Sequence, residues 1–256
     1  KPGVKFIFDM HDLQHTWVRM PAPNSLLRKL ASYRMKSSML RMASSADEII
    51  TSSQGFSDWL KERGLDSTPI ENRPLNAKKP GFPSNRGIGY FGKIRDRTSF
   101  KLLFDAVELI PENDRPRIII AGDGTKLESV KKLAEKYSSH QIEFTGRFDH
   151  TELPSLMSKI NLMFAMYSPK RGNIGDGALP SKMFEAAAYG RPSIVNANTP
   201  MGELCEAENL GVSVQWNDAQ KLADAIMKLE GKMTDLEIDG KREKKRFFET
   251  IAKLRI

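Results

Sequence analysis

From Gly87 onward the sequence alternates between short apolar runs and amphipathic segments, and this alternation restricts the fold more than any other feature. The runs GIGYFG (residues 87–92) and RIIIAGDG (117–124) are strand-sized, whereas SFKLLFDAVELI (99–110) carries apolar residues at helical spacing. Continuous apolar strands separated by amphipathic helices are typical of a parallel sheet covered on both faces. Residues 87–231 are therefore predicted to form a doubly wound α/β domain, which binds ligands beyond the carboxyl ends of its strands.

The first 75 residues carry a shorter version of the same pattern. Strands are expected at VKFIFD (4–9) and DEIITS (47–52), with a basic helix over 25–43 between them and a second helix over 54–63. Two strands are too few for a comfortable core, so residues 1–75 are interpreted as part of a second α/β domain. Residues 76–86, rich in proline, glycine and lysine, read as a linker. A charged helix is expected over 232–256.

Composition and charge exclude several classes of protein. No apolar run approaches the ~18 residues that a membrane-spanning helix needs. The single cysteine, Cys205, excludes an internal disulfide framework, and one cysteine with four scattered histidines cannot build the usual zinc site. A net charge of +8 fits nucleic acid, an anionic membrane or phosphorylated small molecules as a partner. Because no element that reads base edges is visible, nucleic acid is not expected.

The best candidate for a phosphate-binding loop is SPKRGNIGDGALPSK (168–182). It follows a predicted strand, contains three glycines and leads into a helix whose first turn carries Pro180 and Lys182. Helix N-termini offer unpaired N–H groups and a partial positive charge, which suit an anion. A second glycine turn, AGDGT (121–125), is more readily explained as a tight turn that needs a positive φ.

Glu185 is a carboxylate among small and apolar residues in the helix that follows this loop. It lies one turn beyond Ser181 on the same helical face, and the three alanines after it allow the helix to pack closely on the sheet. A carboxylate here accepts hydrogen bonds from two adjacent hydroxyls, as a ribose presents them. An ordinary solvated glutamate fits the periodicity equally well, so both interpretations stay open at this point.

The stretch LPSKMFEAAAYGRPSIV (179–195) resembles the donor-site motif of the retaining GT-B glycosyltransferases of glycosyltransferase family four. Other segments resemble that family in the same order, namely FIFDMHDL (6–13), ADEIITSSQGFSDWLKERG (46–64), GYFGKI (89–94), IIIAGDG (118–124) and EFTGRFDHTELPSLMSKINLMF (143–164). The resemblance extends to about Leu229. It implies a GT-B fold with a Rossmann-like, nucleotide-sugar-binding C-terminal domain, preceded by an N-terminal Rossmann-like domain whose first strands this chain is expected to lack.

The resemblance also implies roles for individual residues. Glu185 matches the ribose-binding glutamate, while Ser181 and Lys182, with the backbone of Gly177, Ala178 and Leu179, match the diphosphate-binding turn. Lys93 and Arg97 match basic residues placed against the donor phosphates and leaving group, Gly92 allows close backbone approach, and Arg147 and Phe148 border the base. His11 matches a histidine near the transferred sugar. Solvated loop cations at Lys93 and Arg97, and a structural histidine at a strand end, are the competing interpretations.

One position departs from the family pattern. The family's longer motif has a second glutamate, eight residues before the first, which touches the donor sugar. In this chain that position is Gly177, with Asp176 beside it. The contacts to the donor sugar are therefore open, and Asp176 is a candidate substitute.

The function that the resemblance implies is transfer of a hexosyl group from a nucleotide-sugar to a glycan or lipid-linked acceptor, with retention at the anomeric carbon. No cofactor or metal is expected, because cations and a helix N-terminus would stabilise the departing diphosphate. The basic helix from Arg28 to Arg41 would face an anionic membrane, or is merely solvated, and the expected location is the cytoplasm, at the inner face of the membrane. The alternative is a non-catalytic nucleotide-sugar-binding fragment or partner subunit, motivated by the incomplete N-terminal half.

Overall fold

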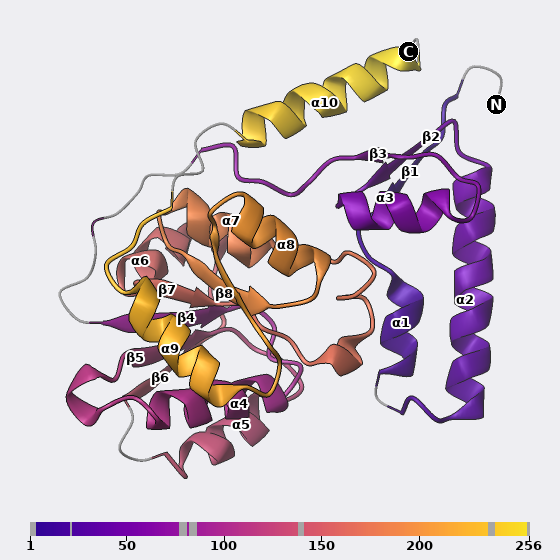
Figure 1. Ribbon diagram of the computed structural model, residues 1–256. Coiled ribbons are helices and arrows are strands. Elements are labelled where there is room, and N and C mark those ends of the chain that lie inside the picture. Colours follow the sequence, from indigo (N-terminus) through magenta and orange to yellow (C-terminus); the bar gives the residue numbers. More distant parts are fainter. Residues whose placement is uncertain are drawn as a thin grey trace. The chain divides into compact units, whose positions relative to one another are not determined.

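The computed structural model of the chain, drawn in Figure 1, describes residues 4–20, 22–76, 81, 86–137, 141–234 and 239–254. The chain divides into two compact units. Unit 1 comprises Lys1–Leu75, Pro169–Leu179 and Ile238–Ile256, and unit 2 comprises Asn76–Ser168 and Pro180–Glu237.

Unit 2 is built on a six-stranded sheet in which every pair of neighbouring strands is parallel. In spatial order the strands are β6 (Ile142–Gly146), β5 (Arg117–Ala121), β4 (Gly87–Phe91), β7 (Leu162–Phe164), β8 (Ser193–Asn196) and β9 (Gly211–Val214). The central strand β4 is buried along its whole length, which explains why its sequence is apolar without alternation. The predicted doubly wound α/β domain is confirmed.

Helices cover both faces of this sheet. They are α4 (Thr98–Glu108), α5 (Leu127–Ala134) and α9 (Ala219–Leu229) on one face, and α6 (Leu153–Ser158), α7 (Ser181–Ala188) and α8 (Pro200–Ala207) on the other (Figure 1), with the short 3-10 turns η1 (Glu112–Asp114) and η2 (His150–Glu152) in the connections. Phe100, Leu103 and Phe104 of α4 pack with Ile118 of β5 and Ile226 of α9 in the main core. The three α4 residues lie in the segment 99–110, where the spacing of the apolar residues predicted an amphipathic helix.

Unit 1 contains a three-stranded parallel sheet in the order β1 (Ile7–Met10), β2 (Glu48–Thr51) and β3 (Thr68–Pro69). Its helices are α1 (Gln14–Arg19), α2 (Leu26–Ser44), α3 (Gln54–Lys61) and α10 (Asp239–Lys253). Ser53 begins α3 by accepting a hydrogen bond from the Phe56 N–H at 3.1 Å, and Phe56, Trp59 and Leu60 then turn into a small core. The two strands and two helices predicted for residues 1–75 are present as β1, β2, α2 and α3.

The charged helix α10 belongs to unit 1 through specific polar contacts. The buried Glu243 carboxylate accepts a hydrogen bond from the Glu71 N–H at 2.8 Å, and the Arg246 guanidinium donates to the Pro69 carbonyl oxygen at 3.0 Å. Gly240 lies so close to the Pro74 backbone that a Cβ would collide with it. This helix therefore docks along the chain segment that follows β3.

Residues 169–179, which the sequence analysis placed inside the larger domain, group with unit 1. The segment begins with the 3-10 turn η3 (Pro169–Arg171). The Asn173 side-chain amide donates to the Asp12 carboxylate at 2.5 Å, and the Arg171 guanidinium lies 4.7 Å from the centre of the Trp17 ring. Ala178 packs against the small core of unit 1. These side-chain contacts have no local sequence pattern, which is why periodicity could not assign the segment.

Candidate functional site

The carboxyl ends of the parallel strands of unit 2 meet at one edge of the sheet, and the predicted binding residues of this unit gather there. Gly92 directly follows β4, Arg147 follows β6, and α7 begins at Ser181. Gly92 has a φ of +137°, and a Cβ at this position would lie 3.5 Å from the Lys182 ammonium nitrogen. The turn after β4 and the start of α7 are thus close neighbours, and no side chain at position 92 separates them.

The second glycine turn, AGDGT, packs against this first turn. A Cβ at Gly122 would collide with the Gly92 carbonyl, and a Cβ at Gly124 would collide with the Ile94 backbone. Both glycines have φ above +140°, where a residue with a side chain is strained. The packing therefore supports the interpretation of AGDGT as a tight structural turn.

Lys182 lies in the first turn of α7 and is buried, with 8% of its surface exposed. Its ammonium nitrogen is 3.3 Å from the centre of the Tyr90 ring and 5.5 Å from that of Tyr167. The Tyr90 hydroxyl in turn donates to the Lys93 carbonyl at 2.8 Å, which fixes the ring. A cation held over an aromatic face is stabilised there, but it keeps its positive charge for an anion at the edge of the sheet.

The first turn of α7 adds backbone donors to this cation. Pro180 is the N-cap residue and supplies no side-chain hydrogen bond to the N–H groups of the turn. Ser181 is exposed at the first helical position, so its hydroxyl faces solvent. The backbone N–H end of the helix, the Ser181 hydroxyl and the Lys182 ammonium together form an arrangement suited to a phosphate.

Glu185 follows one helical turn later and is half-buried. Burial raises the pKa of its carboxyl group, and the positive charges of His150 and Lys182 lower it by a smaller amount. No residue in the described part of the chain donates a hydrogen bond to this carboxylate. Alanines 186, 187 and 188 are buried, as predicted, so α7 packs closely on the sheet and holds Glu185 at its edge. A partly desolvated carboxylate without hydrogen-bond donors around it can accept hydrogen bonds from the hydroxyl groups of a ligand.

Lys93 lies beyond β4 and forms an ion pair with Asp123, whose pKa is lowered chiefly by the hydrogen bond from Lys93. Arg147 adds a further positive charge near Asp123. Lys93 and Arg147 are both exposed, so each can reorient toward an incoming anion. The predicted cation beyond β4 and the predicted residue beyond β6 are thus neighbours of one carboxylate.

Arg97 occupies a different place, as the residue that immediately precedes α4. Its charge acts on Tyr137, where it opposes a pKa that burial and Asp105 raise to about 12. Beside it, Asp96 accepts hydrogen bonds from the Thr98 and Ser99 hydroxyls and N–H groups. Arg97 is exposed at this helix start, and its predicted role at the leaving group stays a prediction.

Phe148 is half-buried beyond β6, with its ring centre 6.2 Å from that of Phe91 at an angle of 66°. This edge-to-face contact joins the last residue of β4 to the segment after β6 and forms an apolar surface at the edge of the sheet. His150 begins η2 two residues later, and its charge acts on Glu185. The segment after β6 therefore lies at the same edge as α7, and Phe148 offers an aromatic surface there.

His11 lies in unit 1, directly after β1, with an exposed side chain. Its Nε2 atom is 2.9 Å from an Asp9 carboxylate oxygen, and its carbonyl accepts a hydrogen bond from Ser52. Asp9 can thus orient the imidazole. This placement at the carboxyl end of a parallel strand agrees with a functional position, but it equally suits a histidine that finishes a strand.

Gly177, Ala178 and Leu179 lie in the segment that groups with unit 1. Gly177 has a φ of +109°, and a Cβ there would lie 2.5 Å from the Gly55 Cα. Asp176 is half-buried beside it, and burial raises the pKa of its carboxyl group against the opposing charges of Arg63 and Lys36. The glycine at the position of the family's second glutamate is therefore required by backbone packing.

Three residues of this edge were missed by sequence reasoning. Tyr90 and Tyr167, which flank the Lys182 ammonium, appear in the sequence only as apolar residues of predicted strands. His150 was missed as well, because the segment 143–164 was recognised as a family segment without a role for this residue. Side chains alternate in direction along β4, so the sequence predicts which residues share a face of the sheet with Tyr90. It does not indicate that the Tyr90 ring contacts the Lys182 ammonium.

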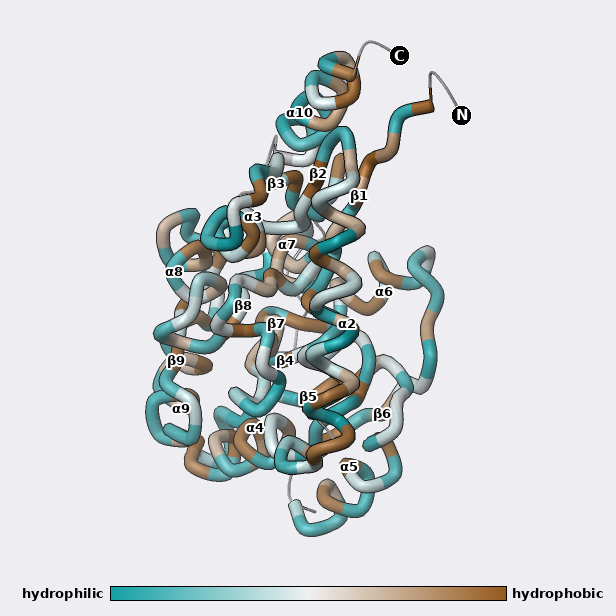
Figure 2. The backbone as a smooth tube through the Cα atoms, turned by 90° about the vertical axis from the view of Figure 1, so that its right-hand side faces the viewer, coloured by the Kyte–Doolittle hydropathy of each residue, from teal (hydrophilic) through white to brown (hydrophobic). Residues whose placement is uncertain are grey.

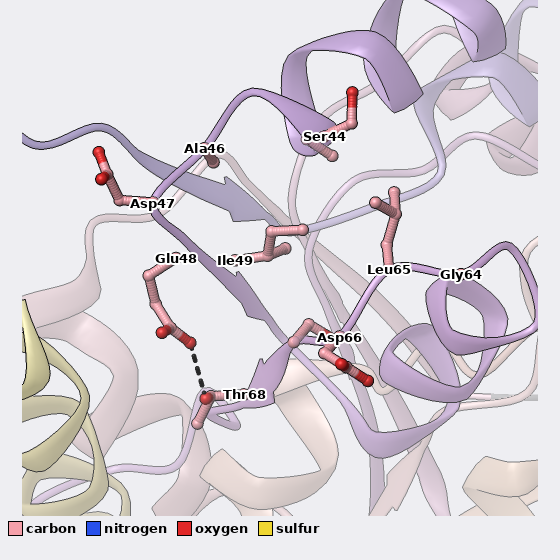
Figure 3. Close-up of a pocket in the computed structure, with 11 residues that line it drawn as sticks. Ser44, Ala46, Asp47, Glu48, Ile49, Gly64, Leu65, Asp66 and Thr68 are labelled. Carbon is pink, nitrogen blue, oxygen red and sulfur yellow. Dashed lines mark hydrogen bonds between the residues drawn. The ribbon is translucent and has the colours of Figure 1, made fainter.

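A pocket of about 340 Å³ lies in unit 1 and is lined by none of the predicted site residues. Figure 3 shows its wall, where Glu48 accepts a hydrogen bond from the Thr68 hydroxyl at 3.0 Å and the carboxylates of Asp47 and Asp66 are nearby. Three carboxylates give this pocket the wrong charge for a phosphorylated ligand. We therefore do not assign it to the nucleotide.

Two general properties concern the described residues as a whole. Among them, no group of three or more His, Cys, Asp or Glu side chains is arranged to hold a metal ion. No helix in this part of the chain combines the length and apolar character that crossing a membrane requires.

Comparison with known proteins gives a consistent result. The family model described as glycosyl transferases group 1 matches residues 72–245. The probable glycosyltransferase WbjE of Pseudomonas aeruginosa is 23% identical over 173 residues, which are 67% of this chain and 42% of that protein. The match to the uncharacterized glycosyltransferase MJ1069 of Methanocaldococcus jannaschii also covers 42% of that protein, so the chain spans less than half the length of these curated relatives.

Solved structures share the fold. Anabaena Alr3699/HepE, in complex with UDP and glucose, is 18% identical with a TM-score of 0.68, over 96% of this chain and 71% of that one. Sucrose-phosphate synthase from Thermosynechococcus elongatus is 19% identical with a TM-score of 0.67, over 95% and 63%. At this identity the likeness concerns the fold alone, and it confirms the predicted GT-B type with Rossmann-like units.

Proposed function

Because the chain belongs to the glycosyl transferases group 1 family, we propose that it acts in the transfer of a sugar from a nucleotide-sugar donor to an acceptor, with unit 2 binding the nucleotide. The observation that carries this proposal is the pairing, in one helix, of a buried lysine at the N-terminus with a half-buried carboxylate one turn later. These two groups match the two chemically distinct parts of a nucleoside diphosphate.

Glu185 is proposed to bind the ribose. A carboxylate has two oxygens that accept hydrogen bonds from vicinal hydroxyls, and a charged acceptor makes each bond stronger than a neutral one. Partial burial, with no hydrogen-bond donor among the described residues, leaves the carboxylate poorly solvated in the free protein. Ribose hydroxyls would relieve that condition on binding, which is a source of affinity and of selectivity for a ribonucleotide.

Lys182, the Ser181 hydroxyl and the N–H groups of the first turn of α7 are proposed to bind the diphosphate. Lys93 and Arg97 would contribute additional positive charge, with Lys93 exchanging Asp123 for a phosphate oxygen. Gly92, Gly177, Ala178 and Leu179 would bring backbone to the diphosphate, and Arg147 and Phe148 would border the base. UDP is the probe of choice, because several solved structures with this fold carry UDP.

The reaction is proposed to retain the anomeric configuration of a hexosyl group. The bond between the anomeric carbon and the diphosphate oxygen breaks, and its electron pair leaves with the nucleoside diphosphate. The acceptor hydroxyl forms the new bond to that carbon on the same face and releases its proton. Cations at the diphosphate stabilise the negative charge that develops there. The acceptor is proposed to be a glycan or a lipid-linked glycan, and metal independence and a cytoplasmic location remain predictions.

His11 is proposed to contact the transferred sugar. This role predicts that His11→Asn lowers the rate of transfer and leaves UDP binding unchanged, because no nucleotide contact is removed. Asp9→Asn would produce a smaller effect in the same direction by releasing the imidazole. An unchanged rate of transfer in the His11→Asn variant would mean that this histidine has only a structural role at the end of the strand.

The proposed function is tested by thermal denaturation with and without UDP. UDP is expected to raise the melting temperature of the protein, and Glu185→Ala is expected to abolish that rise while the variant remains folded. Glu203→Ala, on the exposed side of α8, is the matched control and should retain the rise. Nucleotide binding that survives Glu185→Ala would remove Glu185 from the site. Binding without transfer across a panel of nucleotide-sugars and acceptors would favour the alternative, a non-catalytic binding module or partner subunit.

A further inference from the structure

The turn between β5 and α5, AGDGT (121–125), carries a carboxylate at the edge of unit 2 where the nucleotide is proposed to bind. Strands β4, β5 and β6 follow one another in the sheet, as Figure 2 shows, so the turn after β5 lies between the turns that follow its two neighbours. Asp123 is the one ionisable residue of AGDGT. Its carboxylate therefore lies among residues that the other two turns contribute.

Backbone contacts fix the position of Asp123. Its carbonyl oxygen accepts a hydrogen bond from the Ile94 N–H at 2.7 Å, and the N–H of the preceding Gly122 donates to the Gly146 carbonyl oxygen at 2.7 Å. The glycines on either side of Asp123 lie so close to the backbone of residues 92–94 that neither position has room for a Cβ. Because the backbone is held on both sides and the side chain is short, the carboxylate has few alternative positions.

Two cations act on this carboxylate. The Lys93 ammonium donates a hydrogen bond to an Asp123 carboxylate oxygen, and the two side chains form an ion pair. Arg147, in the turn after β6, adds a second positive charge near Asp123. Both cations are exposed and are proposed to contact the donor. In the absence of a nucleotide, Asp123 thus neutralises part of the positive charge at this edge.

A phosphate oxygen and the Asp123 carboxylate would compete for the same ammonium group. Lysine has a long, flexible side chain, so Lys93 can turn from one anion to the other, whereas the carboxylate stays in place. When a diphosphate binds to Lys93, the ion pair with Asp123 is broken and the negative charge of Asp123 remains near the ligand. Both effects weaken the binding of an anion and leave the binding of an uncharged ligand unaffected.

We propose that Asp123 is an internal competitor of the nucleoside diphosphate, which weakens its binding and hastens its release after the sugar has been transferred. This inference rests on the proposed function and adds to it a residue that controls how long the product stays bound. Differences in affinity at one site are expressed mainly in the rate of dissociation, so the carboxylate acts on product release. The aspartate of AGDGT then has a functional role, while its glycines have a structural one.

The test compares the unchanged protein with Asp123→Asn by calorimetry at low ionic strength, with UDP and uridine as ligands. The substitution keeps the shape of the side chain and removes its charge. The variant is expected to bind UDP roughly tenfold more tightly, which is the order of effect of one nearby charge on a multiply charged ligand in a partly solvated site. Uridine carries no phosphate, so its affinity should not change, and added salt should reduce the gain for UDP. In stopped-flow measurements, UDP should dissociate from the variant more slowly by a similar factor.

Glu143→Gln is the matched control. The Glu143 carboxylate also lies beside one lysine and one arginine, 3.4 Å from the Lys159 ammonium and 4.0 Å from an Arg117 nitrogen. Its side chain is 37% exposed, against 38% for Asp123. Glu143 lies near the amino end of β6, at the opposite edge of the sheet, so Glu143→Gln should bind UDP as the unchanged protein does.

A second comparison separates competition for Lys93 from simple repulsion of the ligand. In the Lys93→Gln background there is no ammonium for the carboxylate and a phosphate to share. Adding Asp123→Asn to this background should therefore increase UDP affinity by less than about threefold. Asp123→Ser removes the same charge with a smaller side chain and should change UDP affinity in the same direction as Asp123→Asn.

Three results would overturn the inference. UDP could bind the unchanged protein and Asp123→Asn equally well, uridine could gain as much affinity as UDP, or the gain could be as large in the Lys93→Gln background as without it. Failure of the proposed function looks different, because UDP would then bind neither the unchanged protein nor Asp123→Asn, and both proposals would be wrong. Circular dichroism and the melting temperature show whether each variant is folded.

Discussion

Gly177 and Glu185 stand eight residues apart in one sequence motif, yet they belong to different units of the structure. Gly177 lies against the backbone of Gly55 in unit 1, with a positive φ and no room for a Cβ. Glu185 lies on α7 in unit 2, half-buried, without a hydrogen-bond donor among the described residues. The residue at position 177 is determined by backbone packing, which leaves no room for a side chain. The Glu185 carboxylate, in contrast, makes no hydrogen bond that would explain it structurally among the described residues.

This difference separates structural from functional reasons for a residue. A glycine in contact with another segment's backbone contributes to stability. Replacing it should lower the free energy of unfolding rather than act directly on ligand binding. A carboxylate that burial disfavours makes the free protein less stable, and replacing it should stabilise the fold while ligand binding is lost. Opposite effects on stability are therefore the signature that distinguishes the two positions.

The largest effect is expected for Gly177→Glu, which introduces the residue of the family pattern. A side chain at this φ, directly against Gly55, should lower the free energy of unfolding by about 3 kcal/mol, measured by urea denaturation. Gly175→Glu is the control, because nothing lies within 4 Å of a Cβ at that position. Equal stability of the two variants would show that the contact between Gly177 and Gly55 does not exclude a side chain.

The next effect concerns the cation of unit 2. Lys182→Gln removes the charge proposed to meet the diphosphate, and UDP affinity should decrease by about 2 kcal/mol, or roughly thirtyfold, in a calorimetric titration. Loss of the contact with Tyr90 should also lower the free energy of unfolding by about 1 kcal/mol. Lys126→Gln removes an equal charge from an exposed position, and its affinity should be unchanged. If Lys182→Gln binds UDP with unchanged affinity, the proposal that the N-terminus of α7 binds the diphosphate is wrong.

A smaller effect is expected in how the free energy of unfolding depends on pH. Burial raises the pKa of the Glu185 carboxyl group in the folded protein. The folded state then holds a proton that the unfolded state has released, so the free energy of unfolding decreases as pH rises from about 4.5, the usual pKa of glutamate. Glu185→Gln should lack this decrease and be the more stable protein at neutral pH in urea denaturation. A variant that is less stable at neutral pH would mean that the carboxylate has a structural partner.

His15 in unit 1 should show the opposite dependence on pH. Burial, followed by the charges of Lys36, Arg63 and Arg19, lowers its pKa to about 4. Between pH 6.5 and 4 the unfolded state binds a proton that the folded state does not, so the free energy of unfolding falls as pH is lowered through this range. His15→Gln should reduce that slope, whereas His11→Gln, at an exposed position, should leave it in place. An unchanged slope in the His15 variant would remove this histidine as its source.

The sequence predicted the fold where physical periodicity is strong. Continuous apolar strands predicted the parallel sheet of unit 2, and the spacing of Phe100, Leu103 and Phe104 predicted the buried side of α4. It did not predict α1, which has six residues and no side-chain cap, or β3, which has two residues. Elements this short carry too few residues to produce a periodic signal.

The site was predictable only in part, for a related reason. Lys182 and Glu185 are found through the helix that follows a glycine-rich loop, because their spacing along α7 is local. The rings of Tyr90 and Tyr167 around the Lys182 ammonium are contacts between distant segments, and no local pattern encodes them. The same holds for the hydrogen bond between Asn173 and Asp12, which contributes to placing residues 169–179 in unit 1.

The central claim is that the Glu185 carboxylate binds the vicinal hydroxyls of a ribose, and one titration experiment tests it directly. The affinities of UDP and 2′,3′-dideoxy-UDP are measured by calorimetry for the unchanged protein and for Glu185→Gln. The unchanged protein should prefer UDP by about 2 kcal/mol, roughly thirtyfold, and the variant should bind both nucleotides with nearly equal, weaker affinity. An undiminished preference for UDP in the Glu185→Gln variant would contradict the claim.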